Sequence, residues 1–174
     1  VKALNNVNFE IMPNEIVGLV GENGAGKTTL MKILVGIYKP DNGQIYLDLK
    51  KIPLGDPQYA NRHGIYMVFQ EQSLLINMTV YENLFLGFEH LFQSKGLIQK
   101  NQMIQKASDL LRQMNLEVDP TLQLNKLSFV QRQMVEILRN LWKANICGTR
   151  NPIVILDEPT SALGENDSLI LFEQ

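Results

Sequence analysis

Apolar residues along the chain occur either as short continuous runs or at helical spacing. Glu15–Val20 and Ile153–Leu156 are short apolar runs, which are typical of strands buried on both faces. Ile65–Phe69 has the same character, and Gln44–Lys50 follows an Asn-Gly turn that favours a strand after it. The pattern therefore predicts strands at these positions.

Between the strands, the spacing of apolar residues predicts amphipathic helices. The helical segments are 28–37, 79–86, 98–114 and 132–146. Thr79 and Glu82 have the spacing of a capping box at the start of one of them. Strands that alternate with helices favour an α/β fold with a largely parallel sheet.

Composition narrows the class of protein. The chain has 174 residues, of which 45% are hydrophobic and 20% are charged, and this is ordinary for one globular domain. The formal net charge is −2 and the 16 Lys and Arg residues are scattered, which argues against nucleic-acid binding. No apolar run reaches the ~18 residues that a membrane helix needs. We interpret the single Cys147 as an inert thiol, since no histidine is near it in sequence.

The sequence GENGAGKT at residues 21–28 matches the phosphate-binding pattern G-x-x-x-x-G-K-[ST]. Glycines let the backbone fold around phosphate oxygens, and N–H groups of the loop and of the following helix then point at the anion. A glycine-rich turn that contains Lys-Thr by chance is the alternative, but the loop stands between a predicted strand and a predicted helix. Lys27 is expected to reach the β- and γ-phosphates, and Thr28 to coordinate Mg²⁺. The candidate nucleotide-binding residues are Gly21, Glu22, Asn23, Gly24, Ala25, Gly26, Lys27, Thr28 and Thr29.

Two carboxylates, Asp157 and Glu158, directly follow the apolar run Ile153–Leu156. A buried strand of this kind places them at its carboxyl end, where open α/β sheets bind ligands. Asp157 is expected to hold Mg²⁺ and Glu158 to polarise an attacking water. An acidic pair after a strand is more often a turn, and the phosphate loop is what favours the catalytic interpretation.

Four segments in order, GENGAGKTTLMKIL, VFQE, KLSFVQRQMVEI and IVILDEPTSAL, resemble the motifs of ATP-binding cassette (ABC) ATPases. The resemblance covers essentially the whole chain. It implies a P-loop NTPase fold of the ABC type, with a mostly parallel core sheet, an antiparallel β portion and a helical signature subdomain. The core is expected over about residues 1–70 and 150–174, and the helical subdomain over about 75–145. The chain opens on Val1 and stops at Gln174 inside apolar patterns, so we expect residues 1–174 to be one incomplete domain, truncated at both ends.

The resemblance also assigns roles. Gln70 is expected to touch the Mg²⁺ and water region and, with Glu158, to be catalytic; the metal set is then Thr28, Gln70 and Asp157. The signature residues, expected to contact ATP held by a partner cassette, are Leu127, Ser128, Phe129, Val130 and Gln131. The switch histidine and the adenine-stacking aromatic residue of the family are expected outside this chain, since neither His63 nor His90 is in position.

Val130 departs from the family, which has glycine there. Ser128 and Gln131 also have the spacing of a capping box, so a capped helix start is the simpler interpretation. A valine is penalised at positive φ, and its branched Cβ crowds a nearby anion. One hypothesis is therefore a nucleotide-binding half-site with weak or no turnover.

The segments TVYENLFLG, QMVEI and TSALGEN resemble ATPases of bacterial sugar importers of the ribose, galactose and xylose type. This implies ATP hydrolysis coupled to transport, a second ABC domain, permease subunits, indirectly a solute-binding protein, and a peripheral site on the cytoplasmic face of the plasma membrane. Importers of purine nucleosides share much of the pattern and stay an alternative. A soluble cassette acting on ribosomes or DNA repair would carry basic or coiled-coil insertions, and a small-molecule kinase has no need of the signature.

Overall fold

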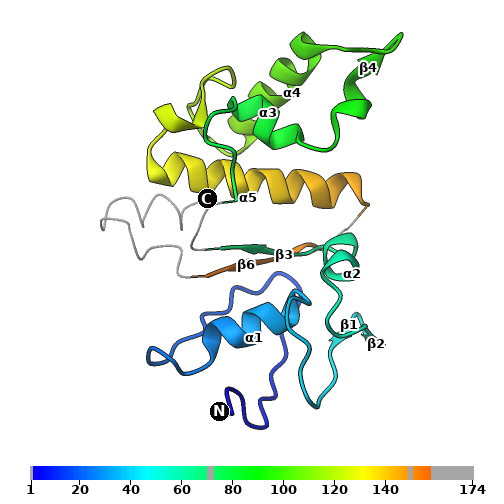
Figure 1. Ribbon diagram of the computed structural model, residues 1–174, viewed down its shortest axis with the longest axis vertical. Coiled ribbons are helices and arrows are strands. Elements are labelled where there is room, and N and C mark those ends of the chain that lie inside the picture. Colours follow the sequence, from blue (N-terminus) through cyan, green and yellow to red (C-terminus); the bar gives the residue numbers. More distant parts are fainter. Residues whose placement is uncertain (1, 70–72, 149–150, 158–174) are drawn as a thin grey trace. The chain divides into compact units, whose positions relative to one another are not determined.

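The computed structural model describes residues 2–69, 73–148 and 151–157 and divides into two compact units (Figure 1). Unit 1 contains Val1–Met67 and Ala144–Asp157. The described part of unit 2 is Val68–Lys143 without residues 70–72.

Unit 1 contains a pair of strands, β3 (Ile65–Val68) and β6 (Ile153–Leu156). The Ile153 N–H donates to the Gly64 carbonyl at 2.8 Å, and the two arrows run in the same direction in Figure 1. All four β3 residues are buried, as expected for a continuous apolar run in a parallel sheet. Both strands predicted from these runs are confirmed.

Two helices belong to unit 1, α1 (Lys27–Leu34) and α2 (Pro57–Arg62). The predicted helix 28–37 corresponds to α1, which ends a few residues early. Asp56 caps α2 by accepting a hydrogen bond from the Tyr59 N–H at 2.9 Å. Pro57 takes the first helical position, where its missing N–H would have no intrahelical partner.

The strand predicted at Glu15–Val20 is not formed. The segment has no strand assignment, and Ile16 and Val20 are 100% and 93% exposed. An extended segment becomes a buried strand only when neighbours satisfy its backbone and cover its side chains. In the part of unit 1 that is described, β3 and β6 form a pair of two strands, so Glu15–Val20 has no such neighbour.

The single strand predicted at Gln44–Lys50 is instead a short antiparallel hairpin. Its strands are β1 (Tyr46–Leu47) and β2 (Lys50–Lys51). Asp48 and Leu49 form the turn between them with φ values of 48° and 64°. Two consecutive positive φ values are the requirement of a tight hairpin turn, and the apolar pattern alone did not reveal it.

Unit 2 is mainly helical. Its helices are α3 (Val80–Phe85), α4 (Lys100–Gln113) and α5 (Phe129–Ile146), the last of which continues into the residues of unit 1. The shorter elements are η1 (Glu89–Phe92), β4 (Gln93–Ser94), β5 (Leu97–Ile98) and η2 (Leu124–Lys126). β4 and β5 form an antiparallel hairpin. The three predicted helices are confirmed with ends shifted by up to three residues.

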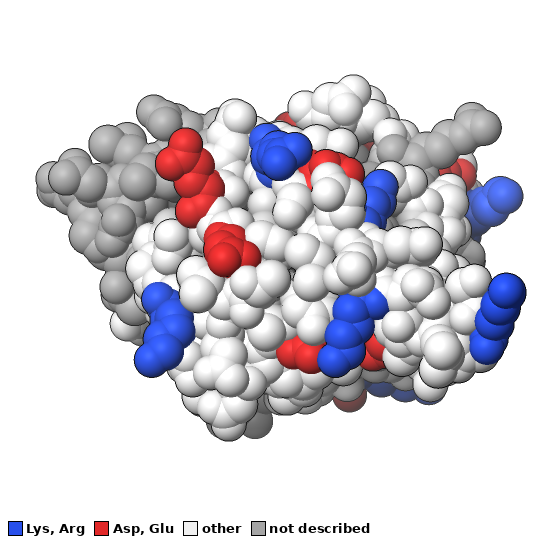
Figure 2. Space-filling view, turned by 90° about the horizontal axis from the view of Figure 1, so that it is seen from above, with Lys and Arg blue, Asp and Glu red and all other residues white. Residues whose placement is uncertain are grey.

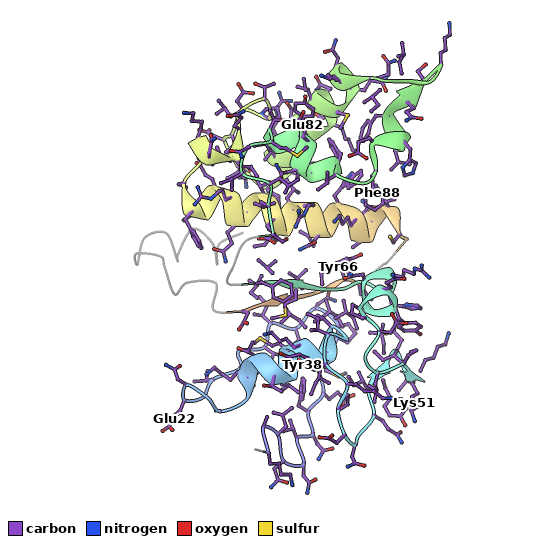
Figure 3. All side chains as sticks on the ribbon, in the orientation of Figure 1. Glu22, Tyr38, Lys51, Tyr66, Glu82 and Phe88 are labelled. Carbon is purple, nitrogen blue, oxygen red and sulfur yellow. The ribbon has the colours of Figure 1, made fainter. Side chains whose placement is uncertain are left out.

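A continuous apolar core holds unit 2 together, with Leu84, Phe85 and Leu111 almost fully buried. The ring of Trp142 on α5 meets Phe85 edge-on at 4.8 Å between centroids, and Phe88 at 5.4 Å. Figure 3 shows Phe88 after α3, pointing toward the end of α5. Such edge-to-face aromatic pairs add to the stabilisation from burial, and they fix α5 against α3.

A backbone ladder joins two distant stretches of unit 2. Residues 76–80 run antiparallel to residues 122–125, with Thr79 and Gln123 bridged. Three backbone N–H groups donate to carbonyl oxygens across this pair at 3.0 to 3.1 Å: Val80 to Leu122, Leu124 to Met78 and Asn125 to Ile76. The entry to α3 and the segment before Leu127 are thereby held together.

Candidate functional site

The predicted phosphate loop leads directly into α1. Lys27, the first residue of α1, points its side chain back into the loop and donates to the carbonyls of Gly21 at 2.7 Å and Glu22 at 2.9 Å. Figure 3 shows Glu22 at the outer tip of the loop. The lysine therefore places a positive charge inside the loop, where an anion would sit.

No side chain caps the start of α1, whose N-cap is Gly26. The N–H groups of the first helical turn are therefore not occupied by a side-chain cap, which is the arrangement that binds anions at a helix N-terminus. Gly26 has a φ of 91°, and a Cβ on it would lie 2.6 Å from the Ala3 carbonyl oxygen. Both observations require glycine at this position.

Thr28 and Asp157 come from opposite ends of unit 1 in sequence and meet in space. The Thr28 hydroxyl donates to Asp157 Oδ1 at 3.3 Å. Both residues are partly buried. The structure thus joins the end of the phosphate loop to the residue that follows β6, as expected when a strand end and a helix start share one site.

The pair is chemically suited to Mg²⁺, which takes oxygen ligands and usually keeps several waters. One hydroxyl and one carboxylate are enough protein ligands when substrate phosphates supply others. Within residues 2–69, 73–148 and 151–157, no group of three or more His, Cys, Asp or Glu could hold a metal ion by itself.

Two of the predicted catalytic residues, Gln70 and Glu158, lie outside the described residues. Their roles stay predictions. The described residues nearest to them in the chain include Val68, the last residue of β3, and Asp157, which directly follows β6.

The signature segment begins α5. Ser128 and Gln131 form the predicted capping box: the Ser128 N–H donates to Gln131 Oε1 at 2.9 Å, and the Gln131 N–H donates to Ser128 Oγ at 3.2 Å. Ser128 is exposed and Leu127 is buried. The hydroxyl is therefore used by the cap while the residue itself stays accessible.

The proposed strain at Val130 is absent. Val130 lies within α5, is not among the residues with positive φ, and is 8% exposed. Its side chain packs with Met134 and lies against Met114, Leu116 and Ile137. The cost of valine at positive φ does not apply here, because this backbone is helical and the valine fills part of the core of unit 2.

Sequence reasoning missed a buried polar group on α5. Glu136 is fully buried and Arg139 is 6% exposed, and Arg139 Nη2 lies 3.5 Å from Glu136 Oε1. Both bond to Ser73, which stands three positions after Gln70. The sequence shows an acid and a base three positions apart on a predicted helix, but Asp109 and Arg112 have the same spacing, so this signal does not indicate burial.

The sequence pattern of the ABC transporter family matches residues 4–161. The chain belongs to the ABC transporter family. It is 40% identical over 169 residues to the ribose import ATP-binding protein RbsA of Geobacillus kaustophilus, covering 97% of this chain and 33% of that protein. It is 41% identical over 172 residues to the RbsA protein of Rhodopirellula baltica, covering 99% and 32%. This ABC chain thus spans about a third of the length of these relatives.

A solved structure agrees with this assignment. The dimeric, post-hydrolysis state of an ATP-binding cassette bound to ADP and Pi has a TM-score of 0.73 and 31% sequence identity, covering 98% of this chain and 72% of that chain. The predicted fold class, a P-loop fold of the ABC type, is confirmed for this ABC family member.

Figure 2 shows Lys and Arg interspersed with Asp and Glu on the face drawn. Among the helices of the described residues, none combines the length and the apolar character needed to cross a membrane.

Proposed function

We propose that this chain is the ATP-binding and hydrolysing cassette that powers import of a sugar through a membrane permease. The observation that carries the proposal is the meeting of Thr28 with Asp157 beside the loop that Lys27 enters. Relatives at about this similarity, such as RbsA of Geobacillus kaustophilus, are named ribose import ATP-binding proteins. That naming favours a sugar over a purine nucleoside.

The loop residues bind and orient the triphosphate. Lys27 exchanges its bonds to the Gly21 and Glu22 carbonyls for the β- and γ-phosphates, or shares them. The backbone N–H groups from Gly24 to Thr29 surround the phosphates, assisted by the positive end of the α1 dipole. The N–H groups of the first turn of α1 are fixed in direction by the helix before binding, so they need little reorganisation when charge develops in the transition state.

Thr28 and Asp157 are the described residues that would hold Mg²⁺, with Gln70 as a third. When bound, the ion neutralises charge on the phosphate oxygens. Asp157 also keeps the Thr28 hydroxyl oriented through their hydrogen bond. Glu158, the next residue in the chain, is assigned the role of polarising the attacking water.

The signature residues 127–131 contact ATP held by a second cassette, in the same chain or in another copy. The exposed Ser128 at the start of α5 supplies the hydroxyl, and the helix N-terminus supplies N–H groups. Closure of the two cassettes acts on permease subunits that receive sugar from a solute-binding protein. The cassette is then peripheral, on the cytoplasmic face of the plasma membrane.

The half-site alternative was based on two arguments, the cost of valine at positive φ and the crowding of a bound anion by its branched Cβ. The backbone at Val130 is helical, so the first argument does not apply, and we favour a working site.

Transport by the full protein, reconstituted with its permease and solute-binding protein in liposomes loaded with ATP, tests the proposal. Uptake of labelled ribose and of labelled galactose is measured for the parent, for Asp157→Asn and for the control Asp109→Asn on α4. We expect sugar uptake that Asp157→Asn lowers by about a hundredfold and Asp109→Asn leaves unchanged. ATP-dependent uptake of a nucleoside, or no uptake of either sugar, would exclude the sugar-import proposal.

A further inference from the structure

Ser73 contacts both Glu136 and Arg139 of α5, and this group of three residues is here named the α5 clamp. Glu136 Oε1 accepts from the Ser73 N–H at 3.2 Å and from the Ser73 hydroxyl. Arg139 donates to the same hydroxyl and to the Ser73 carbonyl at 3.3 Å. Every backbone and side-chain polar group of Ser73 is therefore bonded to one face of α5.

The α5 clamp buries charged groups, and burying a charge costs free energy that an apolar side chain would not. Glu136 is 0% exposed, and its Oε2 has no hydrogen-bond partner; the Arg139 Nε is likewise buried without one. Burial lowers the pKa of the Arg139 guanidinium, and the nearby Glu136 carboxylate acts in the opposite direction. Apolar residues of similar volume usually stabilise such a position as well or better. A polar clamp is therefore better explained by the geometry that it imposes on Ser73.

A second polar contact holds the residue two positions farther along. Asn83 is 0% exposed; its Oδ1 accepts from the Leu75 N–H at 2.8 Å, and its Nδ2 donates to the carbonyls of Leu75 and Thr79, each at 3.0 Å. Together with the ladder between 76–80 and 122–125, this bonds the segment 73–80 at six of its eight residues to α3, to α5 and to the stretch before the signature; the six are Ser73, Leu75, Ile76, Met78, Thr79 and Val80.

We infer that Glu136 and Arg139 are positioning residues that couple the signature at the start of α5 to the segment that follows Gln70. Ser128 caps the start of α5, and Glu136 and Arg139, farther along the same helix, hold Ser73. A displacement of the signature by nucleotide thus moves Ser73 with it, because bonds to both the backbone and the hydroxyl prevent slippage. The inference rests on the proposed function, in which Gln70 is the third residue that holds Mg²⁺ and closure of the two cassettes acts on the permease.

The test separates coupling from folding by replacing both charged partners at once. The double variant Glu136→Met/Arg139→Met keeps the volume of the core and removes the clamp without leaving one charge unpaired. The matched control is the double variant Asp109→Met/Arg112→Met on α4, an acid and a base at the same spacing, 3.8 Å apart, whose side chains are 47% and 77% exposed. The full protein is measured with its permease in liposomes, with labelled ribose as the probe.

The readout is ribose transported per ATP hydrolysed. We expect the clamp variant to lose about fivefold or more in this ratio while the α4 control keeps the parent ratio. A simple loss of folded protein would lower uptake and hydrolysis together and leave the ratio unchanged. A clamp variant with the parent ratio would overturn the inference.

Two further measurements keep the outcomes distinct. If the double variant does not fold, Ser73→Ala, which removes a single oxygen, is expected to lower the same ratio, and an unchanged ratio in that variant would also overturn the inference. Hydrogen exchange of residues 73–80 on addition of ATP should change in the parent and not in the clamp variant. A parent protein that neither hydrolyses ATP nor transports ribose would instead refute the proposed function, and the exchange measurement would still judge the clamp.

Discussion

The phosphate loop and the signature segment are both assigned to contact ATP, and they are built in opposite ways. The loop at residues 21–28 is largely exposed, and it is shaped by backbone conformation and by Lys27 folding back onto carbonyls. The signature at residues 127–131 begins a long helix, with Ser128 at the surface and Val130 in the core. One site depends on the absence of side chains and the other on their packing.

This difference explains which departures from the family each site tolerates. A Cβ at Gly26 meets backbone at 2.6 Å, so the loop cannot accept a larger residue there without moving. Val130 stands where the family has glycine, but its backbone is helical and the neighbouring residues leave room for an apolar side chain. A mismatch with a family pattern therefore has to be weighed against the local backbone conformation before it is considered a defect.

Removing the lysine that enters the loop should have the largest effect. Lys27→Ala loses charge-assisted hydrogen bonds to phosphate, and we expect ATP affinity to fall by about 3 kcal/mol, more than a hundredfold. Lys32→Ala, on the same helix with its ammonium 5.5 Å from the Tyr38 ring centroid, is the matched control and should bind ATP normally. Titration with a fluorescent ATP analogue measures both; equal affinity in the two variants would place the phosphates elsewhere.

Restoring the family glycine at Val130 tests the signature side of the comparison. Val130→Gly loses a buried side chain and adds backbone freedom to a helix, so we expect a loss of about 2 to 3 kcal/mol in unfolding free energy. ATP turnover per folded molecule should stay within about twofold of the parent. Urea unfolding and steady-state hydrolysis measure the two quantities. Turnover about tenfold higher, equal to about 1.4 kcal/mol, would revive the half-site alternative.

Substituting two glycines of the loop distinguishes the loss of stability caused by an unfavourable backbone conformation from the loss caused by a steric clash. Gly24 and Gly26 both have positive φ, 83° and 91°, but only Gly26 has an atom within 4 Å of an added Cβ. Gly24→Ala should cost about 1 to 2 kcal/mol, the usual cost of a left-handed conformation, and Gly26→Ala clearly more. Thermal unfolding of both variants, with and without ATP, provides the comparison. Equal losses of stability in the two variants would mean that the backbone at Ala3 moves away from the added Cβ at little cost in free energy.

Removal of the hydroxyl at the signature tests whether the cap matters to the helix. Ser128→Ala should lower the unfolding free energy by about 1 kcal/mol, the usual value for a lost N-cap. Ser108→Ala, inside α4, is a control expected to be close to neutral, since alanine is the better helix former. Denaturant titration measures both, and a neutral Ser128→Ala would show that the capping bonds exchange freely with water.

The smallest expected effect is a difference between the two capping boxes in how their contribution to stability depends on pH. Hydrogen bonds from Thr79 lower the pKa of Glu82 below its ordinary 4.5, whereas Gln131 in the other box does not titrate. Because the folded pKa is the lower one, this stabilisation is present above about pH 4.5 and is lost as pH falls through the folded value. The effect is modest because solvent screens a partly exposed carboxylate.

Urea midpoints measured from neutral pH downward check this. Glu82→Gln should remove part of the decline in stability on acidification, and Gln131→Glu should add to it. If the pH profiles of the parent and of Glu82→Gln coincide, the Thr79–Glu82 contact does not contribute in solution.

Sequence alone was sufficient where the determining contacts are local. Both capping boxes lie within four consecutive residues, and each was found at its predicted place. Glu15–Val20 was misread because whether an apolar run pairs as a strand depends on residues far away in the chain. The meeting of Thr28 with Asp157, 129 positions apart, was predicted without local contacts, because the phosphate-loop pattern and the carboxyl end of a buried strand each assign a Mg²⁺ ligand.

The α5 clamp could not be read from the sequence for a different reason. Glu136–Arg139 and Asp109–Arg112 have the same spacing on amphipathic helices and the same kinds of charge. One pair is buried and the other is exposed, and periodicity does not distinguish them when a helix is covered on more than one face. Only the packed structure separates the two.

The ladder between residues 76–80 and 122–125 has a consequence for the order of folding. Closing a long loop carries an entropic cost before the contacts that it permits are gained, and such nonlocal pairing slows folding. The turn that presents Ser128 follows directly on that ladder. We therefore expect the signature to acquire its final orientation late in folding, after the chain has returned from α4 to meet the entry of α3.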